Sequence, residues 1–211
     1  MRTEARWIQR VGAISLAAVL AITGGLRVVH GQAQHVRWDI IHFNPATTPP
    51  TVSAGGIASA RANDGSQITL TGSGTFVAPG GPGRGTSGAV TGGGTWTICG
   101  PPAPATPGCV VGVSGTYEVT GLVRWDPAPF APGGGPVTDL IDEGVPSTGL
   151  AVLSIVYNDG ERGILVVSCT GVTAPASMFE GITASKGYVD YWNRVAPVAG
   201  VDANRTLFHI E

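Results

Sequence analysis

The triplet Gly-Thr-aromatic occurs three times between residues 74 and 117, and it constrains the fold more than any other feature of the chain. The copies begin at Gly74, Gly94 and Gly115, at offsets of 20 and then 21 positions. Each copy lies in a run that alternates small or apolar residues with Ser and Thr, which is typical of strands with one buried face. The repeat therefore predicts neighbouring antiparallel strands, but it predicts no activity.

Two runs show this alternation most clearly, Ser66–Ala78 and Val111–Trp125. In the second run, the period of two places Tyr117 and Val123 on the inward side. The remaining candidate strands are Thr51–Asn63, Val90–Ile98, Leu150–Tyr157, Glu161–Cys169 and Arg205–Ile210. Met178–Arg194 is expected to hold a strand followed by a short helix or a second strand.

Glycines occupy many of the inward positions, which favours long and strongly coiled strands because glycine permits sharp bends and leaves room for a neighbouring ring. These glycines are Gly72, Gly74, Gly92, Gly94, Gly115 and Gly121. We therefore expect an all-β fold, an antiparallel β-barrel of about eight strands. A β-sandwich is the alternative.

The first 33 residues have the pattern of a signal peptide. Three arginines precede the apolar run Val11–Ile22, and Gly31-Gln32-Ala33 is a small-x-small cleavage site. Twelve apolar residues are too few to span a bilayer. We expect cleavage near Ala33, a secreted product, and one domain over residues 34–211. An uncut anchor is the alternative.

The expected mature chain has eight basic and thirteen acidic residues, a net charge of −5. Nucleic acids and anionic membranes are bound through clustered Lys and Arg, and this chain has one lysine, Lys186, and scattered arginines. The composition thus argues against both as partners of the mature protein.

Three cysteines follow the cleavage site, at positions 99, 109 and 169. In an oxidising compartment we expect a disulfide between Cys99 and Cys109, which flank the Pro-rich loop Gly100–Gly108. Cys169 remains, as a buried thiol or a reactive one. The buried thiol is favoured because no His or Lys adjoins it in the sequence.

The stretch Pro127–Gly149 is long for a loop in a compact domain, and such loops often cover or bind ligands. A loop without function is the alternative. Within it, Asp139–Asp142 is a candidate for one helical turn.

Signatures of known chemistry are missing from the sequence. There is no nucleophile elbow, no H-E-x-x-H and no phosphate-binding glycine loop. His35 and His42 are seven residues apart on one expected strand, so they point to opposite faces and do not form a metal site. We expect no metal and no cofactor.

Two features are candidates for a binding site. Val-Arg-Trp-Asp occurs at residues 36–39 and 123–126, and Trp beside Arg and Asp can stack on a ring and bind its edges. From these copies we select Trp38, Asp39, Arg124 and Trp125. Alternatively, each Trp plugs the barrel and each Arg pairs with its Asp.

The second candidate is the polar and aromatic stretch 186–194, from which we select Lys186, Tyr191 and Trp192. Clusters of this composition line ligand pockets, and they also cap hydrophobic cores.

Through Ser53–Ala60, Thr71–Phe76, Gly93–Trp96 and Phe179–Asn193, the chain resembles a group of exported bacterial β-proteins to which no activity is assigned. Its Gly-Thr-aromatic strands are more distantly similar to the small β-barrels of the dirigent and allene oxide cyclase group. That similarity implies a barrel that holds a hydrophobic substrate, and it transfers no functional residue.

Three functions fit the sequence. The first is a non-catalytic exported barrel that binds a small apolar or aromatic ligand or an extracellular surface component. The second is a barrel-type isomerase or cyclase with a single polar catalytic group. The third is a structural or adhesive surface protein with a solid interior. A cavity near Trp38 or Trp125 would favour the first two, and an interior filled by Phe76, Trp96 and Tyr117 would count against them.

Overall fold

The structure of the protein is a computed structural model. It describes residues 33–78, 89–101, 112–132, 135–197 and 204–211. All of the expected signal peptide except Ala33 lies outside these residues. The described residues contain no helix long and apolar enough to cross a membrane.

The described residues form strands and connections, without a helix, as the alternation in the sequence predicts. The fourteen strands are β1 (Gln34–Asn44), β2 (Thr51–Ala54), β3 (Ala58–Arg61), β4 (Gln67–Leu70), β5 (Ser73–Ala78), β6 (Gly93–Cys99), β7 (Val113–Ala128), β8 (Thr138–Asp139), β9 (Val145–Tyr157), β10 (Arg162–Cys169), β11 (Gly181–Lys186), β12 (Val189–Tyr191), β13 (Asn193–Arg194) and β14 (Thr206–Ile210).

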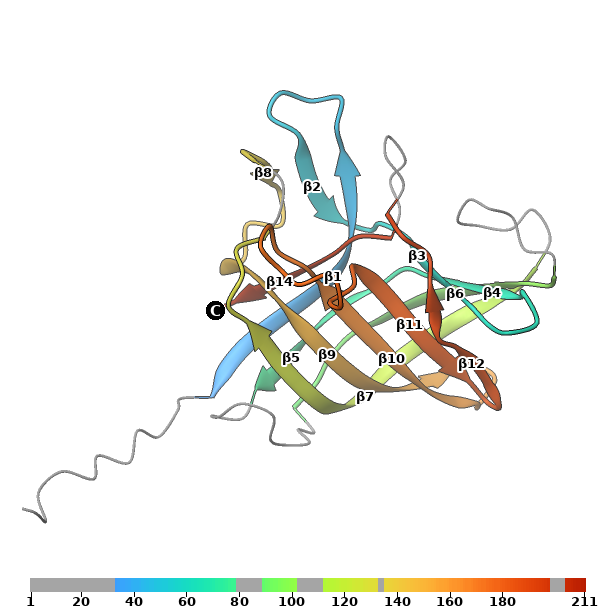
Figure 1. Cartoon of the computed structure of the whole chain (residues 1–211). Coiled ribbons are helices and arrows are strands. Elements are labelled where there is room, and N and C mark those ends of the chain that lie inside the picture. Colours follow the sequence, from blue (N-terminus) through green and yellow to red (C-terminus); the bar gives the residue numbers. More distant parts are fainter. Residues whose placement is uncertain (1–32, 79–88, 102–111, 133–134, 198–203) are drawn as a thin grey trace, which may run out of the picture. The chain divides into compact units, whose positions relative to one another are not determined.

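Six of these strands close into an antiparallel barrel (Figure 1), in the order β1, β5, β6, β7, β9, β14 and back to β1. The expected antiparallel β-barrel is thus confirmed. The closed ring has six strands instead of about eight, because the other strands extend the sheet from it.

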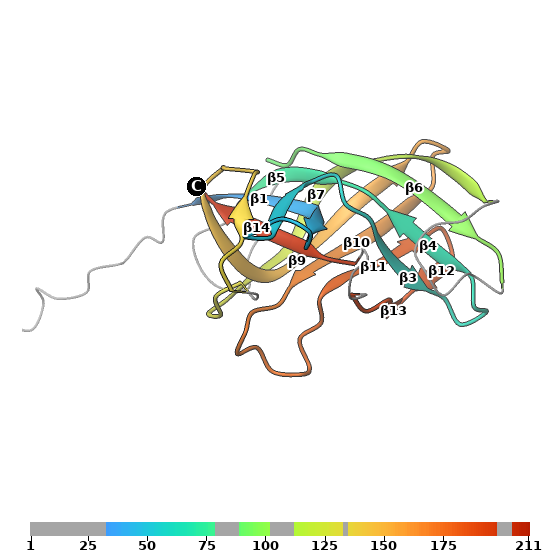
Figure 2. The ribbon, with the colours of Figure 1, turned by 90° about the horizontal axis from the view of Figure 1, so that it is seen from above.

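Two extensions of the sheet widen one end of the barrel. On one side β10, β11 and β12 continue from β9, and on the other β4, β3 and β13 continue from β6. β11 lies against β3, so the two extensions meet. The chain between β10 and β11 leaves the barrel wall and returns to it (Figure 2).

The strand expected over Ser66–Ala78 is interrupted, and forms β4 and β5 with Thr71 and Gly72 between them. On the side away from β6, the two halves pair with different strands: β4 pairs with β3, and β5 pairs with β1. The alternation places Ile68, Leu70 and Phe76 on the inward side, and all three are buried. In β4 the residues of the other face, Gln67 and Thr69, are buried as well.

In β7 the alternation changes side, which corrects the prediction for Val123. Register shifts between Val119 and Gly121 and between Leu122 and Arg124 mark β-bulges, and each added residue reverses the faces. Leu122 and Trp125 are consequently buried, whereas Val123 is 41% exposed.

The stretch Pro127–Gly149 is shorter as a loop than expected. β7 extends to Ala128, and β9 begins at Val145. Instead of a helical turn, Thr138 and Asp139 form β8, which pairs in parallel with β2. β2 in turn pairs with the end of β1, so this hairpin and β8 stand beside the barrel.

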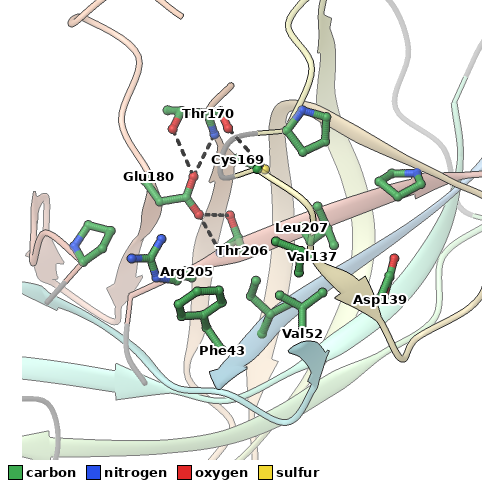
Figure 3. A pocket seen from close by; sticks show the side chains of 15 residues that line it. Phe43, Val52, Val137, Asp139, Cys169, Thr170, Glu180, Arg205, Thr206 and Leu207 are labelled. Atoms are coloured by element: carbon green, nitrogen blue, oxygen red, sulfur yellow. Dashed lines mark hydrogen bonds between the residues drawn. The ribbon is translucent and has the colours of Figure 1, made fainter. Parts of the chain in front are cut away.

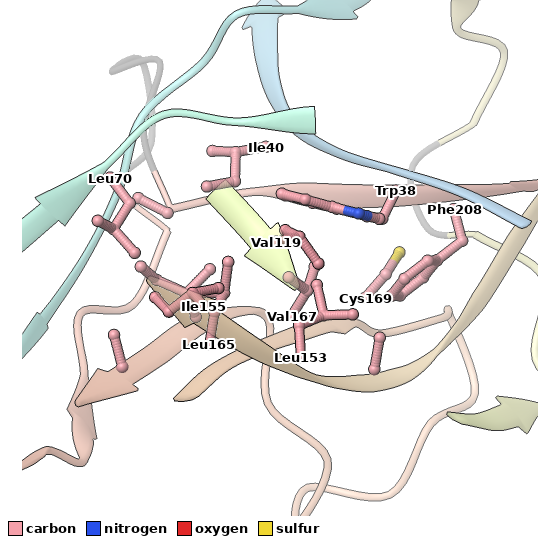
Figure 4. Close-up of a cluster of buried hydrophobic side chains, with 14 of the residues drawn as sticks. Trp38, Ile40, Leu70, Val119, Leu153, Ile155, Leu165, Val167, Cys169 and Phe208 are labelled. Carbon is pink, nitrogen blue, oxygen red and sulfur yellow. The ribbon is translucent and has the colours of Figure 1, made fainter. Parts of the chain in front are cut away.

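Large side chains fill the barrel interior (Figure 4). Phe76, Trp96 and Tyr117, the aromatic residues of the three triplets, are at most 3% exposed. A Cβ on Gly74 would lie 2.9 Å from Nε1 of Trp38, so the bare backbone at this position accommodates the indole. Gly115 makes room for an indole in the same way, with Nε1 of Trp96 2.8 Å from its Cβ position, whereas Gly94 lies against the backbone of Thr71.

Candidate functional site

The two tryptophans selected from the Val-Arg-Trp-Asp repeats lie inside the barrel and converge on one side chain. Trp38 is opposite Phe208 in the β1–β14 register. The ring of Trp125 lies 4.7 Å from that of Phe208 and 5.3 Å from that of Phe76, edge to face in both pairs. Both tryptophans are therefore part of the packed core. Their indole N–H groups are buried and have no hydrogen-bond partner among the described residues.

Within each repeat, the Arg side chain pairs with the Asp two residues later, on the face of the strand that points away from the barrel interior. Arg37 donates two hydrogen bonds to Asp39, of 2.8 and 3.0 Å, and Arg124 pairs with Asp126. Asp39 is completely buried, whereas the Arg124 side chain is 61% exposed. Asp39 and Arg124 are thus engaged, in the arrangement that the alternative interpretation predicts.

Lys186 ends β11, at the end of the barrel where Trp96 and Tyr157 lie, in an aromatic and acidic environment. Its ammonium group is 4.7 Å from the ring centre of Trp96 and 5.0 Å from that of Tyr157, and it pairs with Asp159 and Glu161. Desolvation lowers the pKa of Lys186, but the hydrogen bonds to both carboxylates outweigh it, so the pKa is raised. Lys186 therefore caps this end of the core as a cation.

The other two residues of this stretch point in different directions. Tyr191 is buried, and Trp192 is 55% exposed and donates a hydrogen bond of 3.0 Å to the side chain of Asn63. Lys186, Tyr191 and Trp192 therefore do not share one pocket, and the seven selected residues do not form a single site.

A cleft of about 630 Å³ lies on the outer side of β14 and is lined by none of these seven residues, although Asp39 lies opposite its lining residue Leu207 in the β1–β14 register. Its walls come from the end of β1, from β2, from the segment around β8, and from the connections before β11 and β14. Figure 3 shows its lining, in which apolar side chains predominate. The central ones are Ile41, Phe43, Val52, Val137 and Leu207.

Glu180 lies at one side of the cleft, where it joins two segments of the chain (Figure 3). Its carboxyl group accepts hydrogen bonds from the backbone N–H groups of Thr170, at 2.8 Å, and Thr206, at 2.7 Å. Burial raises the pKa of Glu180, and the hydrogen bonds from Thr170 and Thr206, followed by the charge of Arg205, oppose that shift. Glu180 thus connects the start of the β10–β11 connection with β14.

Arg205 brings a positive charge into the cleft. Its guanidinium group lies 4.9 Å from the ring centre of Phe43, within the range of a cation–π contact. Its Nε is buried and has no hydrogen-bond partner in the part of the chain that the structure describes. Arg205 differs in this from Arg37 and Arg124, which both pair with carboxylates.

Asp139 borders the cleft and is held by β14. His209 is completely buried, and its Nε2 lies 2.6 Å from a carboxylate oxygen of Asp139. Asp139 also accepts a hydrogen bond from the backbone N–H of Ile141. The contact with His209 holds the segment around β8 against β14, and the bond to Ile141 shapes the turn that follows Asp139.

Cys169 forms part of the cleft floor. It is a free cysteine, 3% exposed. Burial, followed by the charge of Glu180, raises the pKa of its thiol well above the usual range. The thiol is therefore a poor nucleophile, which agrees with the buried alternative. Cys99 ends β6, and its expected disulfide partner Cys109 lies outside the described residues.

A second groove, of about 780 Å³, runs over the outer face of β7, β9 and β10 near the bulges. Val123 and Ile164, its exposed apolar residues, are 41% and 36% exposed. The groove offers one charged side chain, Arg162, among those that line it. Neither this groove nor the cleft is lined by Trp38 or Trp125.

Sequence reasoning missed the cleft because its walls are far apart in the chain. Phe43 and Arg205 meet only because β1 pairs with β14, which also joins the N–H of Ile41 to the carbonyl of Arg205 at 3.0 Å. The expected closing strand Arg205–Ile210 was the available signal, since its alternation places Arg205, Leu207 and His209 on one face. The sequence does not show which strand that face adjoins.

No protein-family model matches the chain, and neither the curated proteins nor the solved structures contain a match.

Proposed function

We propose that the protein is an exported β-barrel that binds a small, largely apolar or aromatic ligand in the cleft beside β14, without catalysis. The observation that carries this proposal is the cleft itself, whose volume of about 630 Å³ lies within the range of small-molecule sites. Apolar walls with a few polar groups at fixed positions are also characteristic of such sites.

The packing of the barrel supports a ligand outside it. Phe76, Trp96 and Tyr117 occupy the interior, which counts against the interior site that the sequence suggested. The cleft instead lies between the barrel wall and the β1–β2 hairpin, where side chains of long connections complete the walls.

Export and the Cys99–Cys109 disulfide remain part of the proposal. The basic and apolar N-terminus and the cleavage motif at Gly31–Ala33 support export. An oxidising compartment would favour the disulfide. The buried free thiol of Cys169 is compatible with that compartment because it is shielded from exchange.

The test is native mass spectrometry of the protein purified from its own culture medium, in the wild type and two variants. Val137→Trp places a large side chain in the cleft, at a partly buried position. Val123→Trp places the same side chain in the second groove and serves as the matched control.

We expect a co-purifying mass on the wild type and on Val123→Trp, and its loss from Val137→Trp. Loss from Val123→Trp alone would move the ligand to the second groove and overturn the assignment to the cleft. A wild type that carries no added mass would favour the structural or adhesive alternative, which the solid interior fits.

A barrel-type isomerase or cyclase is the second candidate, and Glu180 is the observation that favours it. Its pKa is raised and its carboxyl group borders the cleft, as a general acid would require. Turnover of a small molecule from the culture medium, lost in Glu180→Gln, would support this candidate. Retention of an unchanged ligand by both proteins would support binding alone.

A further inference from the structure

The Arg205 guanidinium is a partly buried cation that forms no ion pair with a described carboxylate, although its charge acts on the buried Glu180 and lowers the pKa of that group. No hydrogen bond or ion pair joins it to another described residue, and its Nε is shielded from solvent without a partner. The contact with Phe43 stabilises the charge but uses none of its N–H donors. Burying an unpaired charge costs free energy, so this position favours any ligand that supplies an anion.

The two acidic groups at the cleft do not serve as that counterion, because other groups hold them. Glu180 accepts from the backbone of Thr170 and Thr206 (Figure 3), and Asp139 is held by His209. No ion pair forms between Arg205 and either carboxyl group. No described residue accepts a hydrogen bond from the Arg205 side chain, so its donors are available to a ligand as far as these residues go.

We propose that the cleft takes an apolar or aromatic carboxylic acid, with its carboxylate on Arg205 and its apolar body along Phe43, Val52 and Leu207. This inference rests on the proposed ligand-binding function. A guanidinium fits a carboxylate because its N–H groups donate two parallel hydrogen bonds. The apolar walls then bind the rest of the molecule by excluding water.

The test compares three probes of the same shape and different charge: naphthalene-2-carboxylate, naphthalene-2-carboxamide and 2-naphthylmethylammonium. Their affinities are measured by isothermal titration calorimetry on the purified full chain. We expect the carboxylate to bind about 10- to 100-fold more tightly than the carboxamide, the range of a charge-assisted hydrogen bond. The ammonium probe should bind most weakly.

The variants isolate the charge of Arg205. Arg205→Met keeps an unbranched side chain beside Phe43 and should remove the preference for the carboxylate, while the carboxamide affinity changes less than about threefold. Arg205→Lys keeps the charge without the planar donor pair and should retain part of the preference. The matched control is Arg194→Met, since Arg194 is also partly buried and lies over a Phe ring, 5.5 Å from the centre of Phe179, without lining the cleft.

The outcomes separate this inference from the proposed function. Equal binding of the carboxylate and the carboxamide to the wild type would overturn the anion site and leave ligand binding in place. A preference for the carboxylate that persists in a folded Arg205→Met, or is lost in Arg194→Met, would also overturn the role of Arg205. Binding of none of the three probes would overturn both proposals.

Discussion

The hydroxyl of Tyr117 donates a hydrogen bond of 2.8 Å to the carbonyl of Thr71, at the gap between β4 and β5. The oxygen reaches this carbonyl across Gly72, in the space that a Cβ on residue 72 would occupy. The aromatic residue of the third triplet thus contacts the two residues, Thr71 and Gly72, at which the predicted strand is interrupted.

Gly72→Ala should lower the free energy of unfolding by about 2–4 kcal/mol, because the added methyl group displaces the Tyr117 hydroxyl and breaks its hydrogen bond. Tyr117→Phe removes that oxygen. The double variant should therefore lose about 1 kcal/mol less than the sum of the single variants, measured by urea unfolding.

Gly100→Ala is the control for this pair, since a Cβ there would meet no heavy atom within 4 Å. We expect its stability to lie within about 0.5 kcal/mol of the wild type. If the free-energy losses of Gly72→Ala and Tyr117→Phe were strictly additive, the added methyl group would not clash with the Tyr117 hydroxyl.

The two Val-Arg-Trp-Asp copies provide a second comparison, because one sequence stands in two environments. Asp39→Asn leaves Arg37 without its buried partner, while Glu143 still pairs with it, and should cost about 2–4 kcal/mol. Asp126→Asn breaks the exposed pair with Arg124 and should cost less than about 1 kcal/mol.

Urea unfolding of both Asn variants measures this difference. Raising the salt concentration should reduce the small effect of Asp126→Asn and leave that of Asp39→Asn nearly unchanged, because solvent ions screen exposed pairs. Equal costs for the two variants would contradict the contrast in burial.

The sequence predicts the walls of the barrel well, because period-two alternation depends only on neighbouring residues. Ile68, Leu70 and Phe76 lie inside as that pattern requires. The pattern fails at Val123, since a bulge adds a residue to one strand without changing the composition of the run. The closed ring has six strands and not about eight for a related reason: local alternation does not show whether a strand closes the ring or extends the sheet beyond it.

The candidate site was less predictable than the fold. The Val-Arg-Trp-Asp repeats predicted a site at Trp38 and Trp125, but both side chains pack in the core, as large aromatic residues on strands often do. The cleft depends on contacts between β1, β14 and three connections, so its key pair, Phe43 and Arg205, has no spacing that a sequence pattern can detect.

Glu180→Gln should lower the free energy of unfolding by about 1–3 kcal/mol at neutral pH. The amide nitrogen cannot accept a hydrogen bond, so one of the two backbone N–H groups, of Thr170 or Thr206, loses its acceptor. Urea unfolding measures the loss, and Glu118→Gln, at an exposed position on β7, is the control that should change little.

The stability difference between wild type and Glu180→Gln should also depend on pH. Because the pKa of Glu180 is raised in the folded protein, the folded state holds its proton more tightly than the unfolded state does. The contribution of Glu180 is therefore largest below its ordinary pKa and falls as the pH rises through the raised pKa. Unfolding at pH 4, 5, 6 and 7 tests the sign, and an advantage that grows toward pH 7 would contradict it.

Thiol labelling tests the proposed disulfide and the buried cysteine together. Without reductant, we expect no reactive thiol in the folded protein and one in urea, because Cys169 is buried and Cys99 and Cys109 are bonded. Cys109→Ser should expose a second thiol in urea and lower the free energy of unfolding by about 2.5–3 kcal/mol, through the loss of a short closed loop. Cys169→Ser should remove the single urea-exposed thiol and leave the bridge intact. Three reactive thiols in urea, with no reductant present, would show that the bridge between residues 99 and 109 does not form.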